Sequence, residues 1–327
     1  MLLLLVYRSL RQHAFSTLVT AGSIALASGL LTAVWTVREE SRAAFTGQSA
    51  GFDAVLGARA SKLQLVLNAV FHLEESPGNV AWADVEAIRN EPGVEHAIPI
   101  AMGDSYRGYR VVGTLPEMFD VEFAPGRRHR VTAPGRIFDP ALREAVVGSF
   151  VADRLRLRRG DVIQPSHGIT AAEAHTHEER YLVVGVLEPS NTPADRVIWI
   201  PLEGLQRMSG HDPKAVGEVS AVLVKLRGGG GASGFLLDQK YNKQGERLTW
   251  AWPIGRTVAQ LFGKIAWFDR VLELVAGLVA LVACGSVVAS IHNSMNERRR
   301  DFAILRALGA RRVMVFSSIL IESALIT

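Results

Sequence analysis

Two long apolar runs without a charged residue constrain most strongly how this chain can fold. The first, from Ala14 to Val37, contains 24 residues, and the second runs from Leu274 to Asn296. A helix needs about 20 predominantly apolar residues to cross the hydrocarbon core of a bilayer. We therefore expect transmembrane helices at 14–37 and 269–293, with the more polar segment 38–268 between them.

The residues that flank the first run predict its orientation. Arg8 and Arg11 precede it, whereas the four charged residues that follow it cancel one another. The positive-inside rule then places the N-terminus, residues 1–13, in the cytosol. Because the two helices cross in opposite directions, residues 38–268 are expected outside the cytoplasm, in the periplasm of a bacterial cell. A cleaved signal peptide is the alternative, although its apolar core normally has about 7–15 residues.

Composition supports a membrane protein with a large soluble part. Mean hydropathy is +0.17 and 21% of the residues are charged. Within 38–268, Lys and Arg balance Asp and Glu at 27 each, so the whole net charge of +4 lies outside that segment. A nucleic-acid partner would require a basic patch on the soluble domain, and we exclude this class. The only cysteine, Cys284, lies in the second apolar run, so the sequence allows no intrachain disulfide.

The soluble segment reads as a mixed α/β domain. Short runs rich in Val and Ile, bounded by Gly or Pro, predict strands, and helical spacing of apolar residues predicts helices. Asp104, Tyr106 and Arg107 are interpreted as part of a turn and strand, although they could contact a substrate. Trp250 and Trp252 alternate as in an edge strand. The expected strands are 54–56, 109–113, 145–147, 181–187, 197–200 and 219–226, and the expected helices are 82–90, 150–157 and 202–208.

A short basic segment, NERRRDFAILRALGA at 296–310, follows the second apolar run. Phe302, Leu305 and Leu308 share one helical face, and Gly309 is suited to end the helix. This pattern indicates an amphipathic helix at the cytosolic membrane surface, and a simple basic stop-transfer loop is the alternative. A further apolar run starts at Val313 and reaches Thr327, which is too short to cross a bilayer, so we expect the native protein to continue.

This arrangement, with ERRRDFAILRALGARR at 297–312, resembles the permease subunits of the MacB/FtsX-type ABC transporter superfamily, which includes lipoprotein-releasing and macrolide-exporter permeases. The resemblance implies a multi-pass protein of the bacterial inner membrane. It implies a cytosolic coupling helix at 294–312 that docks on an ATPase, and a third transmembrane helix beginning at 313–327. The implied ATPase-coupling residues are Glu297, Arg298, Arg299, Arg300, Phe302, Leu305, Arg306, Leu308 and Gly309.

The resemblance also divides the periplasmic α+β domain and names partners. A membrane-proximal subdomain is expected from 45–115 and 218–265, with a β-rich insertion at 116–217. The implied partners are a homodimeric or paired homologous permease, a periplasmic adaptor or substrate protein, and membrane lipid.

The chain has no P-loop. Its one Gly-Lys pair, Gly263-Lys264, is followed by Ile265 and lacks the upstream glycine that a phosphate-binding loop requires. We therefore expect a non-catalytic permease subunit, with ATP and Mg²⁺ bound by an ATPase on a separate chain.

A histidine-rich stretch is the one local pattern that suggests site chemistry. His167, His175 and His177 lie close together, followed by Glu178 and Glu179. Imidazole nitrogens with one carboxylate oxygen suit zinc, and His-x-His places two ligands on one face of an extended strand. The sequence thus suggests a site for zinc, copper or nickel at His167, His175 and His177, with Glu178 or Glu179 as an oxygen ligand; zinc with Glu178 is the set we adopt. A polar surface loop is the alternative.

Three functions follow from these patterns. The first is a permease that converts ATP hydrolysis by a partner into a shape change of its periplasmic domain, for export or extraction of a substrate. The second is a metal-binding or metal-linked membrane transport protein that uses the histidine loop. The third is a membrane-anchored periplasmic scaffold.

Overall fold

The computed structural model describes residues 11, 14–46, 50–168, 176–211, 216–297, 299–307, 309, 313 and 316–317. The chain divides into two compact units. Residues 43–263 form one unit, which we call the sheet domain, and residues 1–42 with 264–327 form the other, which we call the helical unit. Each is described by itself.

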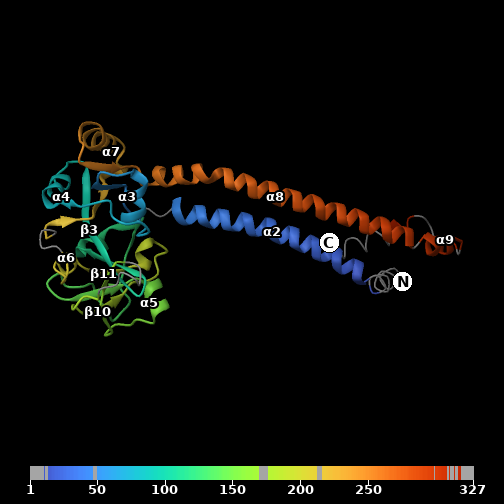
Figure 1. The fold of residues 1–327 in the computed structure, drawn as a ribbon, viewed down its shortest axis with the longest axis horizontal. Coiled ribbons are helices and arrows are strands. Elements are labelled where there is room, and N and C mark those ends of the chain that lie inside the picture. The colour runs from blue at the N-terminus through green and yellow to red at the C-terminus, as the bar shows by residue number, and fades with distance from the viewer. Residues whose placement is uncertain are drawn as a thin grey trace. The chain divides into compact units, whose positions relative to one another are not determined.

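A mixed sheet organises the sheet domain (Figure 1). Its ten strands among the described residues are β1 (Ala54–Ala58), β3 (Val94–Tyr106), β4 (Tyr109–Thr114), β7 (Glu144–Val147), β8 (Val162–Ile163), β9 (Ser166–His167), β10 (Tyr181–Val186), β11 (Ile198–Pro201), β13 (Ala221–Leu226) and β14 (Leu248–Ala251). The order is β14-β1-β13-β3-β4-β11-β7-β10-β8, and β9 pairs with β3. The parallel pairs β4–β11 and β7–β10 lie within an otherwise antiparallel arrangement.

Short helices and two small strand pairs surround the sheet. The α-helices are α3 (Lys62–Ala69), α4 (Trp82–Arg89), α5 (Ser149–Leu155), α6 (Leu202–Gln206) and α7 (Gly231–Asp238). Tighter or wider turns form η1 (Pro116–Asp120), η2 (Pro193–Arg196), η4 (Arg227–Gly229) and η5 (Gln239–Gln244). The strand pairs are β2 (Val80–Ala81) with β12 (Glu218–Val219), and β5 (Glu122–Ala124) with β6 (Arg127–Arg128).

Both faces of the sheet are buried. Along β11, Ile198 and Ile200 join one hydrophobic core while Trp199 joins the other, because successive side chains of a strand point to opposite faces. The first core also contains side chains of α4, α5, α6 and α7, and the second contains side chains of α3 and η1. Strands that are covered on both faces read as continuous Val and Ile runs, which explains why the sequence indicated them.

The two predicted parts of the periplasmic domain contribute to one continuous sheet. The strands β14, β1, β13, β3 and β4 come from 45–115 and 218–265, and β11, β7, β10 and β8 come from 116–217. The strand β9 also belongs to 116–217, yet it pairs with β3. The insertion therefore extends the sheet beside β4 and returns to contact β3.

The predicted strands and helices of the domain are found close to their expected positions, whereas α3 and one long strand were not expected. The longest strand, β3, has 13 residues and was not predicted. Pro99 and Gly103 interrupt its sequence pattern, and both residue types argue against a central strand when they are read locally. Asp104 and Tyr106 consequently lie within β3, and Arg107 forms the turn to β4.

The alternation of Trp250 and Trp252 predicted the edge strand β14. The side chain of Asn242 forms hydrogen bonds with the outer edge of this strand. Asn242 donates from its amide nitrogen to the Trp250 carbonyl at 2.8 Å and accepts from the Trp250 backbone N–H at 3.0 Å. The amide thus pairs with both backbone groups of Trp250, as a neighbouring strand would.

Long helices dominate the helical unit. The helix α2 (Ala14–Thr46) covers the predicted span 14–37, α8 (Ile254–Glu297) covers 269–293, and α9 (Arg299–Ala307) follows it. Judged by length and hydropathy, no helix within the described part of the chain qualifies as a membrane span.

Candidate metal centre

Asp104 lies at an irregular point of the sheet. The register between β3 and β4 shifts between Met102 and Asp104, so a local bulge sets the direction of the Asp104 side chain. On its other side, β3 pairs with the short strand β9 and places Asp104 opposite His167. The carboxylate is fully buried. A buried charge in a sheet requires partners, and three histidines provide them.

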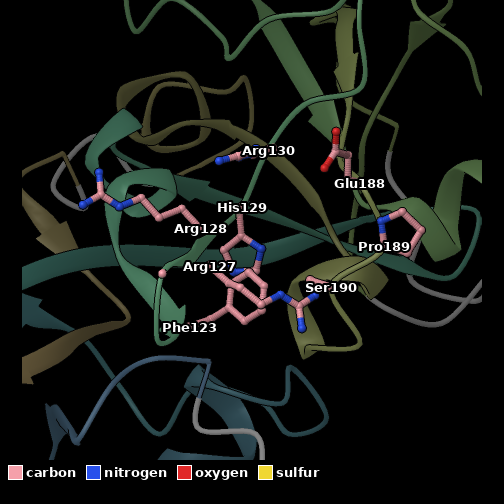
Figure 2. A pocket seen from close by; sticks show the side chains of 9 residues that line it. Phe123, Arg127, Arg128, His129, Arg130, Glu188, Pro189 and Ser190 are labelled. Atoms are coloured by element: carbon pink, nitrogen blue, oxygen red, sulfur yellow. The ribbon is translucent and has the colours of Figure 1, made fainter.

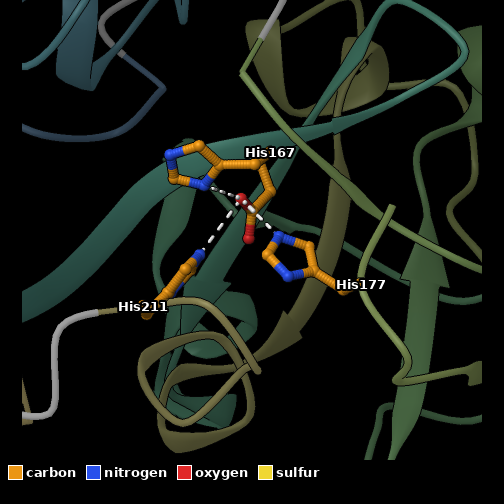
Figure 3. A group of neighbouring side chains, drawn as sticks. His167, His177 and His211 are labelled. Atoms are coloured by element: carbon orange, nitrogen blue, oxygen red, sulfur yellow. Dashed lines mark hydrogen bonds and ion pairs between the residues drawn. The ribbon is translucent and has the colours of Figure 1, made fainter. Parts of the chain in front are cut away.

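The three histidines converge on one oxygen of Asp104 (Figure 3). Asp104 Oδ1 lies 3.1 Å from His177 Nε2, 3.3 Å from His211 Nε2 and 3.3 Å from His167 Nδ1. His167 belongs to β9, His177 precedes β10, and His211 follows α6. The four candidate ligand atoms all lie within 4.8 Å of one another.

Three of the six spacings between these atoms approach those of a tetrahedral zinc site. Zinc binds imidazole nitrogen and carboxylate oxygen at about 2.0–2.2 Å, so the edge of the coordination tetrahedron is about 3.3–3.6 Å. The three measured oxygen-to-nitrogen distances of 3.1–3.3 Å approach that edge length. The donor set of three imidazoles and one carboxylate also suits zinc, with copper, nickel and iron as chemical alternatives.

A second layer of hydrogen bonds orients His177. Its Nδ1 lies 2.6 Å from the backbone carbonyl oxygen of Ser209, which can only accept, so Nδ1 carries a proton. In the neutral ring Nε2 then presents a lone pair toward the Asp104 carboxylate. Ser209 in turn donates from its N–H and its hydroxyl to Glu179, at 3.1 and 2.9 Å. His177 Nε2 and the Asp104 carboxylate are then two acceptors that face each other, and they require a proton or a metal cation between them. A hydrogen bond from the other ring nitrogen to a backbone carbonyl, as His177 makes to Ser209, is typical of metal-binding histidines.

Charge and burial agree with a cation at this position. Burial alone would raise the pKa of Asp104, but hydrogen bonds and charges from His211 and His177 outweigh it and hold that pKa below its usual value. The hydrogen bond to Asp104 raises the pKa of His211. Asp104 Oδ2 is buried without a hydrogen-bond partner among the described residues. The His167 side chain is 56% exposed, so the cluster is open to solvent on one side.

The cluster only partly coincides with the residues that the sequence suggested. His167 and His177 lie together in it, whereas His175 lies outside the described residues. Glu178 is exposed and does not belong to the cluster, and the neighbouring Glu179 supports Ser209 instead. Asp104 and His211 were not recognised as candidate ligands, and no local spacing could have connected them, since they are separated by 107 residues.

The predicted coupling residues that the structure describes lie in α9 or next to it. Glu297 ends α8, Arg299, Arg300, Phe302, Leu305 and Arg306 belong to α9, and Arg298 and Leu308 lie outside the described residues. Gly309 adopts a left-handed conformation with φ of +93°, which favours glycine after a helix end.

Family comparison identifies the class of protein. Residues 17–232 match the MacB-like periplasmic core domain, and residues 273–327 match the FtsX-like permease C-terminal domain. Because the first match covers more than half of the chain, the chain belongs to the MacB/FtsX-type family of ABC transporter permeases. This family implies an inner-membrane permease component with a periplasmic domain, which works with ABC ATPases.

Solved structures of periplasmic or extracellular domains are also similar to this chain. The extracellular domain of the ABC-type transporter YknZ from Gram-positive bacteria shares 16% sequence identity, with coverage of 61% of this chain and 99% of that one and a TM-score of 0.36. The periplasmic region of MacB from Actinobacillus actinomycetemcomitans shares 10% identity, with coverage of 66% and 94% and a TM-score of 0.43.

Proposed function

We propose that this chain is a mechanotransmitting permease subunit, in which ATP hydrolysis on a separate chain moves α9 and the sheet domain responds with a change of shape. Family membership and the absence of a P-loop support a non-catalytic subunit that depends on a partner ATPase. In this proposal α2 and α8 lie in the inner membrane, and the sheet domain lies in the periplasm.

The continuity of α8 carries the proposal. Its first residues, including Ile254 and Val258, are buried in the second core of the sheet domain, and its last residue, Glu297, lies at the start of the basic segment 296–310. The helix has 44 residues, which corresponds to about 66 Å at 1.5 Å per residue, and contains no proline. A displacement of α9 can therefore reach the core of the sheet domain through a single helix.

Stimulated ATP hydrolysis tests the coupling role. We would reconstitute the full chain with the ABC ATPase that co-purifies with it and measure the rate of hydrolysis. Leu305→Asp should abolish the stimulation because it places a charge on the predicted apolar face of α9. Ala307→Asp is the matched control, since successive residues rotate by about 100° and residue 307 lies away from that face. Equal stimulation by both variants would contradict the proposal.

The geometry at Asp104 supports a second proposed function, the binding of a metal ion by the sheet domain. We propose that Asp104, His167, His177 and His211 bind a divalent transition ion, with zinc as the ion that a donor set of imidazoles and one carboxylate suits. The single carrying observation is the convergence of three imidazole nitrogens on one buried carboxylate oxygen.

Calorimetric titration of the full chain with zinc chloride tests this second proposal. We expect one zinc ion per chain in the parent and loss of binding in a His177→Ala, His211→Ala double variant. A parent protein that binds no zinc, or a double variant that binds it equally well, would show that the cluster is a hydrogen-bonded network only.

A further inference from the structure

A cavity that shares no lining residue with the metal cluster lies next to the β5–β6 hairpin. It has a volume of about 210 Å³ and lies between residues 123–130 and residues 188–190. The two walls are held together by a backbone hydrogen bond of 2.8 Å from the Glu188 N–H to the Arg130 carbonyl. The cavity is therefore a regular part of the fold, with room for several water molecules or a small solute.

His129 is the unusual residue of this cavity (Figure 2). Its side chain lies at the centre of the lining residues and packs against the ring of Phe123, with 4.6 Å between centroids and an interplanar angle of 31°. It is only 5% exposed, yet neither ring nitrogen has a hydrogen-bond partner among the described residues. Buried polar groups in native proteins are nearly always hydrogen-bonded, so His129 is a polar side chain beside the cavity that the described residues leave unsatisfied.

The charged side chains that line the cavity favour a negatively charged ligand. Arg127, Arg128 and Arg130 contribute three cations, and Glu188 is the one acidic side chain in the lining. Arg128 forms a long ion pair of 3.5 Å with Glu122, whereas the Arg127 guanidinium lies over the Phe123 ring at 5.0 Å from its centroid. An anion would meet charge-assisted donors that are geometrically suited to phosphate and carboxylate oxygens.

The protonation of His129 fits the same ligand. Burial lowers the pKa of His129 to about 4, against a smaller opposing effect of Asp195. At neutral pH the ring is uncharged and offers one N–H donor and one lone pair. The Asp195 carboxylate does not compete for that donor, because it accepts from Ser190 and Asn191. The N–H remains available for an anionic oxygen, and the Glu188 carboxylate can accept from a hydroxyl of the same ligand.

We propose that this cavity binds the phosphate group of a small hydroxylated phosphate ester, with Arg127 and Arg130 holding the phosphate, His129 donating to it and Glu188 accepting from a ligand hydroxyl. This site lies outside the proposed metal centre and outside α9, and it stands independently of both earlier proposals. Phosphate of this chemistry occurs in soluble esters and in the head groups of glycerophospholipids.

Titration of the full chain with glycerol 3-phosphate, followed by calorimetry, tests the proposal. We expect saturable binding in the parent. His129→Phe keeps an aromatic ring against Phe123 but removes the donor, and Arg130→Gln removes a cation at an exposed position. Each should weaken binding at least tenfold. Arg159→Gln removes an exposed arginine elsewhere in the domain and should leave binding unchanged.

Vesicles separate the two sources of phosphate. Displacement of glycerol 3-phosphate by phosphatidylglycerol vesicles, but not by phosphatidylcholine vesicles, would identify a lipid head group, and a lack of displacement would identify a soluble ester. Either result supports the site when the variants behave as expected. The proposal is overturned if the parent shows no saturable binding, or if the Arg130→Gln variant binds as well as the Arg159→Gln variant. A thermal unfolding temperature close to that of the parent protein establishes that each variant is folded.

Discussion

Replacing Asp104 with asparagine is the sharpest test of the metal centre. The amide keeps the shape of the carboxylate but removes the only negative charge of the cluster. In the metal-free protein its nitrogen can donate to His177 Nε2, whose lone pair faces it at the 3.1 Å position of Oδ1. Asp104→Asn should therefore fold normally and lose affinity for zinc specifically.

The expected size of the effect follows from linkage. A ligand at a free concentration of 100 times its Kd stabilises the folded state by about 2.7 kcal/mol. For a domain the size of residues 43–263, each kcal/mol changes Tm by about 2–4 °C. Zinc should thus raise the Tm of the parent by about 5–11 °C. If the substitution lowers affinity about 100-fold, the gain falls to about 0.4 kcal/mol and the shift to less than about 2 °C.

Thermal unfolding of the full chain, first with EDTA and then with buffered zinc, measures both quantities. Glu178→Gln is the matched control, because Glu178 follows His177 in sequence but is exposed and does not belong to the cluster. We expect the control to keep the full zinc-dependent shift. A shift of equal size in Asp104→Asn, or its loss in Glu178→Gln, would refute the ligand set.

Two further predictions concern the stability of the sheet domain. Gly148→Ala should destabilise the domain by about 1–3 kcal/mol in urea unfolding, since the added Cβ would overlap the backbone carbonyl of Asp195, whereas Gly255→Ala, which meets no neighbour within 4 Å in α8, should be neutral or stabilising. Burial, with a smaller contribution from Arg110, lowers the pKa of His72 to about 3. Because the unfolded chain takes up this proton near pH 6.5 and the folded chain does not, stability is lost as pH falls below 6.5. Between about pH 5.5 and 4, His72→Asn should therefore reduce the pH dependence of the unfolding free energy by about 1.4 kcal/mol per pH unit, and an unchanged slope would contradict the neutral buried ring.

The sequence indicated most of the sheet because the physics that forms these strands is local. Runs such as those of β10 and β11 are buried on both faces, so their Val and Ile content alone identifies them. The sequence did not predict β3, because Pro99 and Gly103 argue locally against a central strand. The pairing of β3 with β13 and β4 accommodates both residues. Tertiary pairing overrode the local pattern there.

The candidate site was harder to predict for a related reason. His167 and His177 attracted attention through their spacing, but the cluster is organised around Asp104, which is 73 residues before His177. A bulge in β3 and the return of β9 to the same strand bring these residues together. Neither event leaves a pattern in the sequence, so a search limited to neighbouring residues selected Glu178 rather than His211.

The amide of Asn242 at the edge of β14 has a consequence for assembly. An exposed edge strand can recruit a strand from another molecule through its free backbone groups, and this process leads to uncontrolled association. At Trp250 both groups are already taken by one side chain, and the opposite end of the sheet, β8, has only two residues. Two copies of this domain therefore have little free backbone at Trp250 and at β8 with which to join their sheets edge to edge.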